Sequence, residues 1–114
     1  MSNQDIDHHI GRLLKKDPRY TPQAYHFVSE AVNYTVSKLE AHRHVSAFEL
    51  LKGVKSLAAS KFGVVSALVL ESWGLSTAHD VGQVVYLLIS EGVLSASEDD
   101  DIRDFDIEFS FDMV

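Results

Sequence analysis

Cysteine is absent from this chain, and proline and glycine are scarce. Without cysteine there is no disulfide, no thiolate metal site and no cysteine nucleophile. Two prolines and six glycines are too few for a low-complexity chain. No segment approaches the ~20 apolar residues of a membrane span, and residues 1–11 lack the apolar stretch of a secretion signal. These absences predict a globular domain with a cytoplasmic location.

Positive charge is also nearly absent from the second half of the chain. Residues 1–61 contain nine basic and six acidic residues, whereas residues 62–114 contain eleven acidic residues and a single base, Arg103. The net charge of −7 works against nonspecific binding to nucleic acid or to anionic membranes. At 114 residues, with no dividing linker, the chain is the size of one domain that buries its own core.

Hydrophobic spacing predicts two helices in the first third of the sequence. Residues 3–16 place apolar side chains at i, i+4, i+7 and i+8, which is one helical stripe. The Asp17-Pro18 pair ends that helix, because a residue before proline is pushed out of the α region. Thr21 is a suitable N-cap, with Pro22 at N1, for a second helix that runs to about Leu39.

Two capping boxes, at residues 46–49 and 77–80, predict the starts of further helices. Between them, residues 64–73 are apolar on nearly every side, which favours a short buried helix. Each of these three helices is expected to end at a glycine: Gly63, Gly74 and Gly92.

After the last of these glycines the apolar period changes from 3.6 to 2. Residues 93–97 predict a short strand, 98–101 a turn, and 102–111 a longer strand with alternating apolar and polar residues. The expected fold class is therefore mainly α (α+β), with five helices followed by a C-terminal β-hairpin. Its second half has the outline of a winged helix.

Fragments between about residues 10 and 110 resemble one family in their order and spacing. They are Asp17-Pro18-Arg19-Tyr20, Ala24-Tyr25 with Phe27, Arg43-His44-Val45-Ser46 with Glu49-Leu50, Phe62-Gly63, Val69-Leu70-Glu71, Trp73-Gly74, Asp80-Val81-Gly82 and Asp104-Phe105. On these fragments the chain resembles the uncharacterised planctomycete and verrucomicrobial repeat-protein family. Val81 departs from the aromatic residue that the family tends to carry there. The resemblance implies one compact α-rich bacterial domain and supplies no catalytic residue.

The winged-helix outline and the charge pattern conflict. Residues 64–73, 74–76 and 77–91 have the spacing of a helix-turn-helix, with the hairpin as its wing. Residues 76–92 nevertheless contain no Lys or Arg, while Asp80 and Glu91 add negative charge. Because DNA-binding proteins gain affinity by neutralising phosphates, nucleic acid is not the expected partner of this face.

A basic cluster surrounds the end of the first predicted helix: Arg12, Lys15, Lys16 and Arg19. One interpretation is that these cations stabilise the helix C-terminus. The other is that the acidic segment 98–112 docks on this cluster, within a monomer or across a dimer.

The corner after this helix predicts a structural clasp rather than a ligand site. Arg19, Tyr20 and Tyr25 are expected to lock the first helix to the second, with Arg19 either hydrogen-bonding carbonyl groups or pairing with an acidic residue such as Asp80. Separately, glycines inside two predicted helices indicate close approach of helices there, because glycine is unfavourable in a helix by ~1 kcal/mol relative to alanine. They are Gly53 and Gly82.

No pattern for metal binding or catalysis stands out. The histidines, including His8-His9 and His42-x-His44, match no zinc spacing. The acidic run 98–101 lacks the glycine and spaced ligands of a calcium loop, which favours a solvated turn. Triads, carboxylate pairs and phosphate-binding loops are not recognisable. We therefore expect no metal, no cofactor and no enzymatic activity.

The function that fits best is a non-catalytic acidic module for protein interaction or dimerisation. Its candidate surface is the last strand, which is either an edge available to a partner or a wing packed on its own helices. The residues that would carry this surface are Asp104, Phe105, Phe109 and Phe111. The alternative is a winged-helix nucleic-acid-binding or transcription-related protein that uses the basic N-terminal half.

Overall fold

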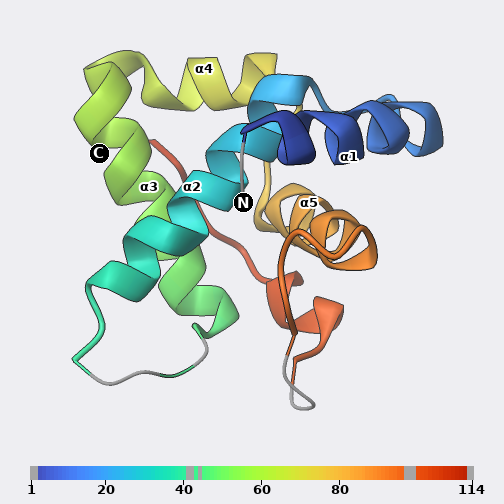
Figure 1. Ribbon diagram of the computed structural model, residues 1–114. Coiled ribbons are helices and arrows are strands. Elements are labelled where there is room, and N and C mark those ends of the chain that lie inside the picture. Colours follow the sequence, from blue (N-terminus) through green and yellow to red (C-terminus); the bar gives the residue numbers. More distant parts are fainter. Residues whose placement is uncertain (1–2, 41–42, 44, 97–99, 113–114) are drawn as a thin grey trace.

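Helices supply all the regular structure in the described part of the chain (Figure 1), which in this computed structural model comprises residues 3–40, 43, 45–96 and 100–112. The α-helices are α1 (Asn3–Lys16), α2 (Pro22–Ser37), α3 (Ala47–Phe62), α4 (Ser66–Ser72) and α5 (Ala78–Ser90). Two 3₁₀ turns accompany them, η1 (Gly63–Val65) and η2 (Ile102–Phe105). The Cα radius of gyration is 13.3 Å, the value of a compact domain of this length.

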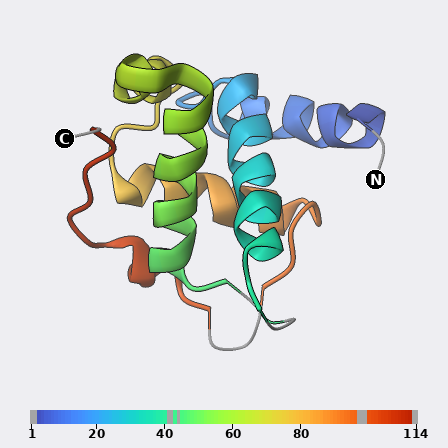
Figure 2. The same ribbon diagram turned by 90° about the vertical axis from the view of Figure 1, so that its left-hand side faces the viewer.

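The antiparallel pair α2 and α3 forms the centre of the fold (Figure 2). These helices approach closely because Gly53 of α3 faces Thr35 of α2, and a Cβ at Gly53 would lie 1.8 Å from the Thr35 hydroxyl oxygen. Thr35 is buried and satisfies its hydroxyl by donating to the Ala31 carbonyl oxygen at 2.7 Å. The close approach predicted at Gly53 is therefore confirmed.

The helix starts follow the predicted caps. The Thr21 hydroxyl accepts from the Ala24 N–H at 3.3 Å at the start of α2. At α3 and α5 both halves of the predicted capping boxes are formed. The helix ends follow the predicted glycines, because Gly63, Gly74 and Gly92 have φ values of 61°, 95° and 77°.

A sharp bend at η1 turns α4 across the end of α3 (Figure 1). Counted through that bend, residues Ala47–Ser72 form a 26-residue helical stretch that contains an 18-residue window with a mean hydropathy of 1.4, enough by length and composition alone to cross a membrane. The expectation that no segment is a membrane span stays a prediction. The stretch also supplies core residues of this fold, among them Leu51, Val54 and Leu70.

The predicted C-terminal β-hairpin is wrong, and with it the α+β class and the winged-helix-like second half. The first strand fails because the chain after α5 bonds back to the helix: the Val93 and Leu94 N–H groups both donate to the Leu88 carbonyl oxygen, at 3.0 and 3.4 Å. The second strand begins instead as η2, where the Asp101 side chain accepts from the Arg103 N–H at 2.8 Å. Helices α4 and α5 are present, but the described chain adds no wing to them.

Residues 106–112, here called the C-terminal strap, run alongside α3 in the same direction as that helix (Figure 2). The alternation of the sequence in this region reflects contact with helices rather than pairing with a strand. Phe105 covers Gly82 of α5, where an added Cβ would lie 2.6 Å from the Phe105 Cβ. Phe111 is 5% exposed, and its ring lies 5.4 Å from that of Phe109.

Candidate functional site

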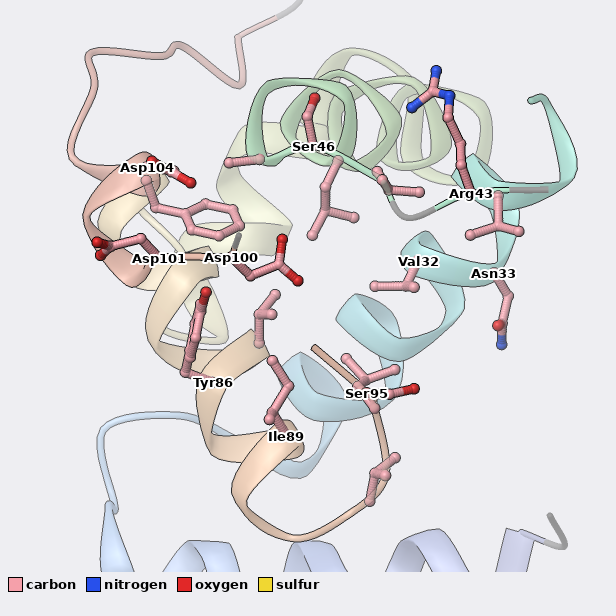
Figure 3. Close-up of a pocket in the computed structure, with 18 residues that line it drawn as sticks. Val32, Asn33, Arg43, Ser46, Tyr86, Ile89, Ser95, Asp100, Asp101 and Asp104 are labelled. Carbon is pink, nitrogen blue, oxygen red and sulfur yellow. The ribbon is translucent and has the colours of Figure 1, made fainter. Parts of the chain in front are cut away.

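A cleft of about 550 Å³ opens between α2, the start of α3, α5 and the segment that contains η2 (Figure 3). This volume lies within the range of ligand-binding pockets. Its wall is largely apolar and includes Val32, Val36, Leu50, Val85, Ile89 and Phe105. The wall thus joins parts of the chain that are far apart in the sequence.

The capping box of α3 fixes one edge of the cleft. Arg43 donates to both carboxylate oxygens of Glu49, at 2.9 and 2.8 Å. Glu49 also accepts from the Ser46 N–H at 3.0 Å as part of the box. Together the Arg43 guanidinium and the Ser46 N–H lower the pKa of Glu49 to about 2. This edge therefore carries a neutralised charge pair and a fixed helix start.

The opposite edge is acidic and comprises Asp100, Asp101 and Asp104. In Figure 3 the Asp100 carboxylate reaches into the cleft, and the Tyr86 hydroxyl lies beside this edge. Burial first, and then the charges of these three carboxylates, raises the pKa of Tyr86. Asp101 is held by Arg103, which lowers the pKa of Asp101 to about 2. Asp101 therefore stays ionised at neutral pH in its ion pair with Arg103.

Among the described residues, the lining offers aliphatic side chains, carboxylates and a phenol whose pKa is raised. Within the described ranges, no group of three or more His, Asp or Glu side chains is placed to hold a metal ion. His42 and His44 lie outside the described residues, as do residue 97 of the predicted strand and residues 98–99 of the predicted acidic turn.

Within one monomer, the basic cluster forms no ion pair with the described part of the acidic segment 98–112, and docking across a dimer stays a prediction. Two of its four side chains, Arg12 and Lys16, reach Glu91 at the end of α5 instead. Arg12 Nε donates to Glu91 Oε1 at 2.9 Å, and Lys16 Nζ lies 3.5 Å from Oε2. His9 Nδ1 lies 2.9 Å from Oε1 as well. Lys15 is exposed. The hydrogen bonds from His9 and Arg12 lower the pKa of Glu91 to about 2.

The predicted clasp between the first helices is built differently from the expectation. Arg19 pairs with Asp17, its Nε donating to Oδ1 at 2.8 Å, rather than with Asp80. The Tyr20 hydroxyl takes that place and donates to Asp80 Oδ1 at 3.0 Å. Asp80 also closes the α5 capping box, so Tyr20 ties the corner after α1 to the start of α5. Tyr25 packs edge-on against the Tyr20 ring at 6.4 Å.

The predicted C-terminal residues separate into three environments. Asp104 and Phe105 line the cleft. Phe111 is buried and unavailable to a partner. Phe109 is half-buried and lies 6.1 Å from Phe48, an α3 ring that is 55% exposed and that the sequence interpretation did not single out.

No protein-family model matches the chain, and no curated protein or solved structure is significantly similar to it. The resemblance to the planctomycete and verrucomicrobial repeat-protein family therefore stays a prediction.

Proposed function

We propose that this protein is a non-catalytic interaction module whose cleft binds an apolar, positively charged segment of another polypeptide. The observation that carries the proposal is the combination of an apolar wall with an acidic edge in one cleft. Pockets of this kind, apolar with a few convergent polar groups, are the usual places where proteins bind ligands.

The apolar wall determines what part of the partner enters. Leu50 and Val85 are buried at the base, while Val32 and Ile89 are partly exposed and form the sides. A Leu, Ile or Met side chain inserted here leaves water on both partners, and burial of apolar surface contributes ~25 cal/mol per Å². A segment that presents one or two such side chains therefore suits the wall.

The acidic edge determines which charge accompanies them. Asp104 is exposed and forms no ion pair with any described residue. Together with the Tyr86 hydroxyl it offers acceptors to a Lys or Arg at the mouth of the cleft. Complementary charge of this kind steers association and fixes the orientation of the partner. The same edge repels phosphate, which disfavours nucleic acid at this site.

The nucleic-acid alternative has less support. In the basic N-terminal half, Arg12 and Lys16 pair with Glu91, and Arg19 pairs with Asp17. These cations are therefore partly neutralised within the molecule and less available to phosphates.

A titration with designed peptides tests the proposal. The probe is a 12-residue peptide of leucine and lysine, and its control is the same peptide with glutamate in place of lysine. We expect the lysine peptide to shift the NMR amide signals of residues around the cleft, and the glutamate peptide to leave them unchanged. Shifts of equal size with both peptides would contradict the role of the acidic edge.

Matched charge reversals locate the binding site. Asp104→Lys should lower the affinity for the lysine peptide about tenfold, equivalent to ~1.4 kcal/mol in binding free energy. Asp112→Lys changes the net charge equally, but Asp112 lies in the C-terminal strap and does not line the cleft. It should have a much smaller effect. If both reversals weaken binding equally, the attraction is general rather than local, and the cleft is not the site.

A further inference from the structure

Exposed aromatic and aliphatic side chains gather on a second surface, away from the cleft wall, where α3 and the C-terminal strap lie side by side (Figure 2). Phe48 of α3 is 55% exposed, and Ile107 of the strap is 43% exposed. Phe109 links them, because it lines the same shallow hollow as Ile107 and its ring centre lies 6.1 Å from that of Phe48 in an edge-on arrangement. We call Phe48, Ile107 and Phe109 the aromatic surface.

Charges of opposite sign flank the aromatic surface. On the α3 side, the Lys52 ammonium lies 5.5 Å from the centre of the Phe48 ring, and the Lys55 ammonium lies 5.9 Å from that of Phe109. On the strap side, Glu108 is exposed between Ile107 and Phe109. Neither lysine forms an ion pair with Glu108 in the described structure. The lysines of α3 and Glu108 of the strap are therefore not paired with each other within the monomer.

We infer that the aromatic surface pairs with the same surface of a second copy of this chain, forming a two-fold symmetric dimer. In such a dimer the same patch is used by both subunits, so the patch must be complementary to itself. A two-fold axis that lies in the interface parallel to α3 and the strap brings the α3 side of one subunit onto the strap side of its partner. Lys52 then faces Glu108 of the second copy, and the pair occurs twice.

The charge layout favours a second copy over an unrelated partner. A surface with one sign of charge selects a partner of the other sign, whereas here both signs flank a single apolar centre. Within one monomer the lysines lie over aromatic rings, where the attraction is modest at exposed sites. Dimerisation adds carboxylate partners for them and covers Phe48 and Ile107. This inference concerns a different surface from the cleft and does not depend on the peptide-binding proposal.

The expected dimer is reversible. A standard interface covers about a tenth of the surface of a small protein, which is roughly 700 Å² here for a subunit with 6784 Å². The three apolar side chains form only the centre of such an area. The net charge of −7 on each copy opposes association at long range. We therefore expect association that depends on protein concentration.

Sedimentation equilibrium of the full chain tests this inference. The apparent mass of the wild type should rise from 12.7 kDa towards twice that value as the concentration increases. Lys52→Glu alone and Glu108→Lys alone should each remain monomeric, because each places like charges opposite one another twice. An equimolar mixture of the two variants should recover the dimer, since both cross-pairs are then of opposite sign. A wild type that stays monomeric to about millimolar concentration, or a mixture that does not recover, overturns the inference.

A matched pair of apolar substitutions distinguishes the aromatic surface from other exposed apolar residues. Phe48→Ser should abolish the rise in mass. Leu68→Ser, at a side chain on α4 that is 66% exposed, should leave it unchanged. Circular dichroism checks that both variants keep the helical fold. If Leu68→Ser rather than Phe48→Ser removes association, the copies meet through α4 and the inference is wrong.

Discussion

Two neighbouring tyrosines offer a direct test of how polar groups contribute to this fold. Tyr20 and Tyr25 are both buried, at 2% and 0% exposure, and their rings contact each other. The Tyr20 hydroxyl donates to the Asp80 carboxylate at 3.0 Å. The Tyr25 hydroxyl is buried without a hydrogen-bond partner among the described residues. The same deletion, tyrosine to phenylalanine, should therefore have opposite consequences at the two positions.

Tyr20→Phe removes a hydrogen bond to a charged group, which is worth about 1.5–3 kcal/mol. Asp80 keeps the N–H groups of Ser76 and Thr77, at 3.0 and 3.1 Å, so its carboxylate remains partly satisfied. We therefore expect a loss of about 1.5–2 kcal/mol in the free energy of unfolding. For a chain of this length that corresponds to a melting temperature lower by roughly 6–8 °C.

Tyr25→Phe removes a hydroxyl whose burial is uncompensated, a situation that costs about 1–3 kcal/mol. We expect the free energy of unfolding to stay constant or to rise by about 1 kcal/mol. The same environment explains why burial raises the pKa of Tyr25 to about 12. The phenolate cannot be solvated there.

Urea denaturation followed by Trp73 fluorescence measures both effects, provided that the m-value stays constant between variants. Tyr34→Phe is the matched control. Its hydroxyl lies 3.1 Å from the Ser56 hydroxyl at an exposed site, so a change within about 0.5 kcal/mol is expected. A loss of more than about 1 kcal/mol in Tyr25→Phe would refute the assignment of an unpartnered hydroxyl. An unchanged Tyr20→Phe would refute the contribution of the Asp80 contact.

Two further predictions concern the helix contacts. Gly53→Leu should lower the free energy of unfolding by about 3 kcal/mol or more, because a side chain there collides with Thr35. The control is Gly11→Ala, at an exposed helical glycine with no neighbour within 4 Å, which should raise the free energy of unfolding by up to about 1 kcal/mol. If urea denaturation gives the same change for Gly53→Leu and Gly11→Ala, Gly53 is not closely packed. Glu91 has a pKa lowered from 4.5 to about 2, so its stabilisation is present above pH 4.5 and is lost as the pH falls towards 2. The urea midpoint of Glu91→Gln should therefore fall less than that of the wild type between pH 4.5 and 2. If the midpoints of both proteins fall equally over this range, the contacts of Glu91 with α1 do not stabilise the fold.

The helices could be predicted because their signals are local. A capping box such as that of Ser46 and Glu49 involves residues three positions apart, and the backbone groups that it satisfies belong to the same turn. The glycines after the helices act within one turn as well, as at Gly92, where a positive φ lets the following N–H return to Leu88. Such contacts form whatever the rest of the chain does.

The sequence does not distinguish a hairpin from the strap, because alternating apolar and polar residues indicate only that one side of an extended segment is buried. They do not indicate what that side packs against. A strand packed on a sheet and an extended segment packed on a helix both show period 2. The deciding contacts are distant in sequence, as with Phe105, which fits over Gly82 only because that position has no side chain. The prediction of close helix approach at Gly82 was wrong about the approaching element, which is the Phe105 side chain of the 3₁₀ turn η2 and not an α-helix.

The candidate cleft was beyond sequence reasoning for the same reason. Val32, Leu50 and Val85 each belong to the apolar stripe of a different helix, and each reads as an ordinary core position. The cleft lies where residues of α2, α3 and α5 meet the segment that contains η2. Among the predicted interaction residues, Asp104 and Phe105 lie in this cleft because η2 positions them there.

Charge asymmetry along the sequence does not become the same asymmetry in space. The first helix brings Arg12 and Lys16 to Glu91, so cations of the basic half neutralise an acid of the acidic half. Along the acidic edge of the cleft, by contrast, Asp104 has no ion pair with a described residue. Asp104 lies beside the apolar wall of the cleft, and this is the basis of the proposal that a positively charged segment binds there.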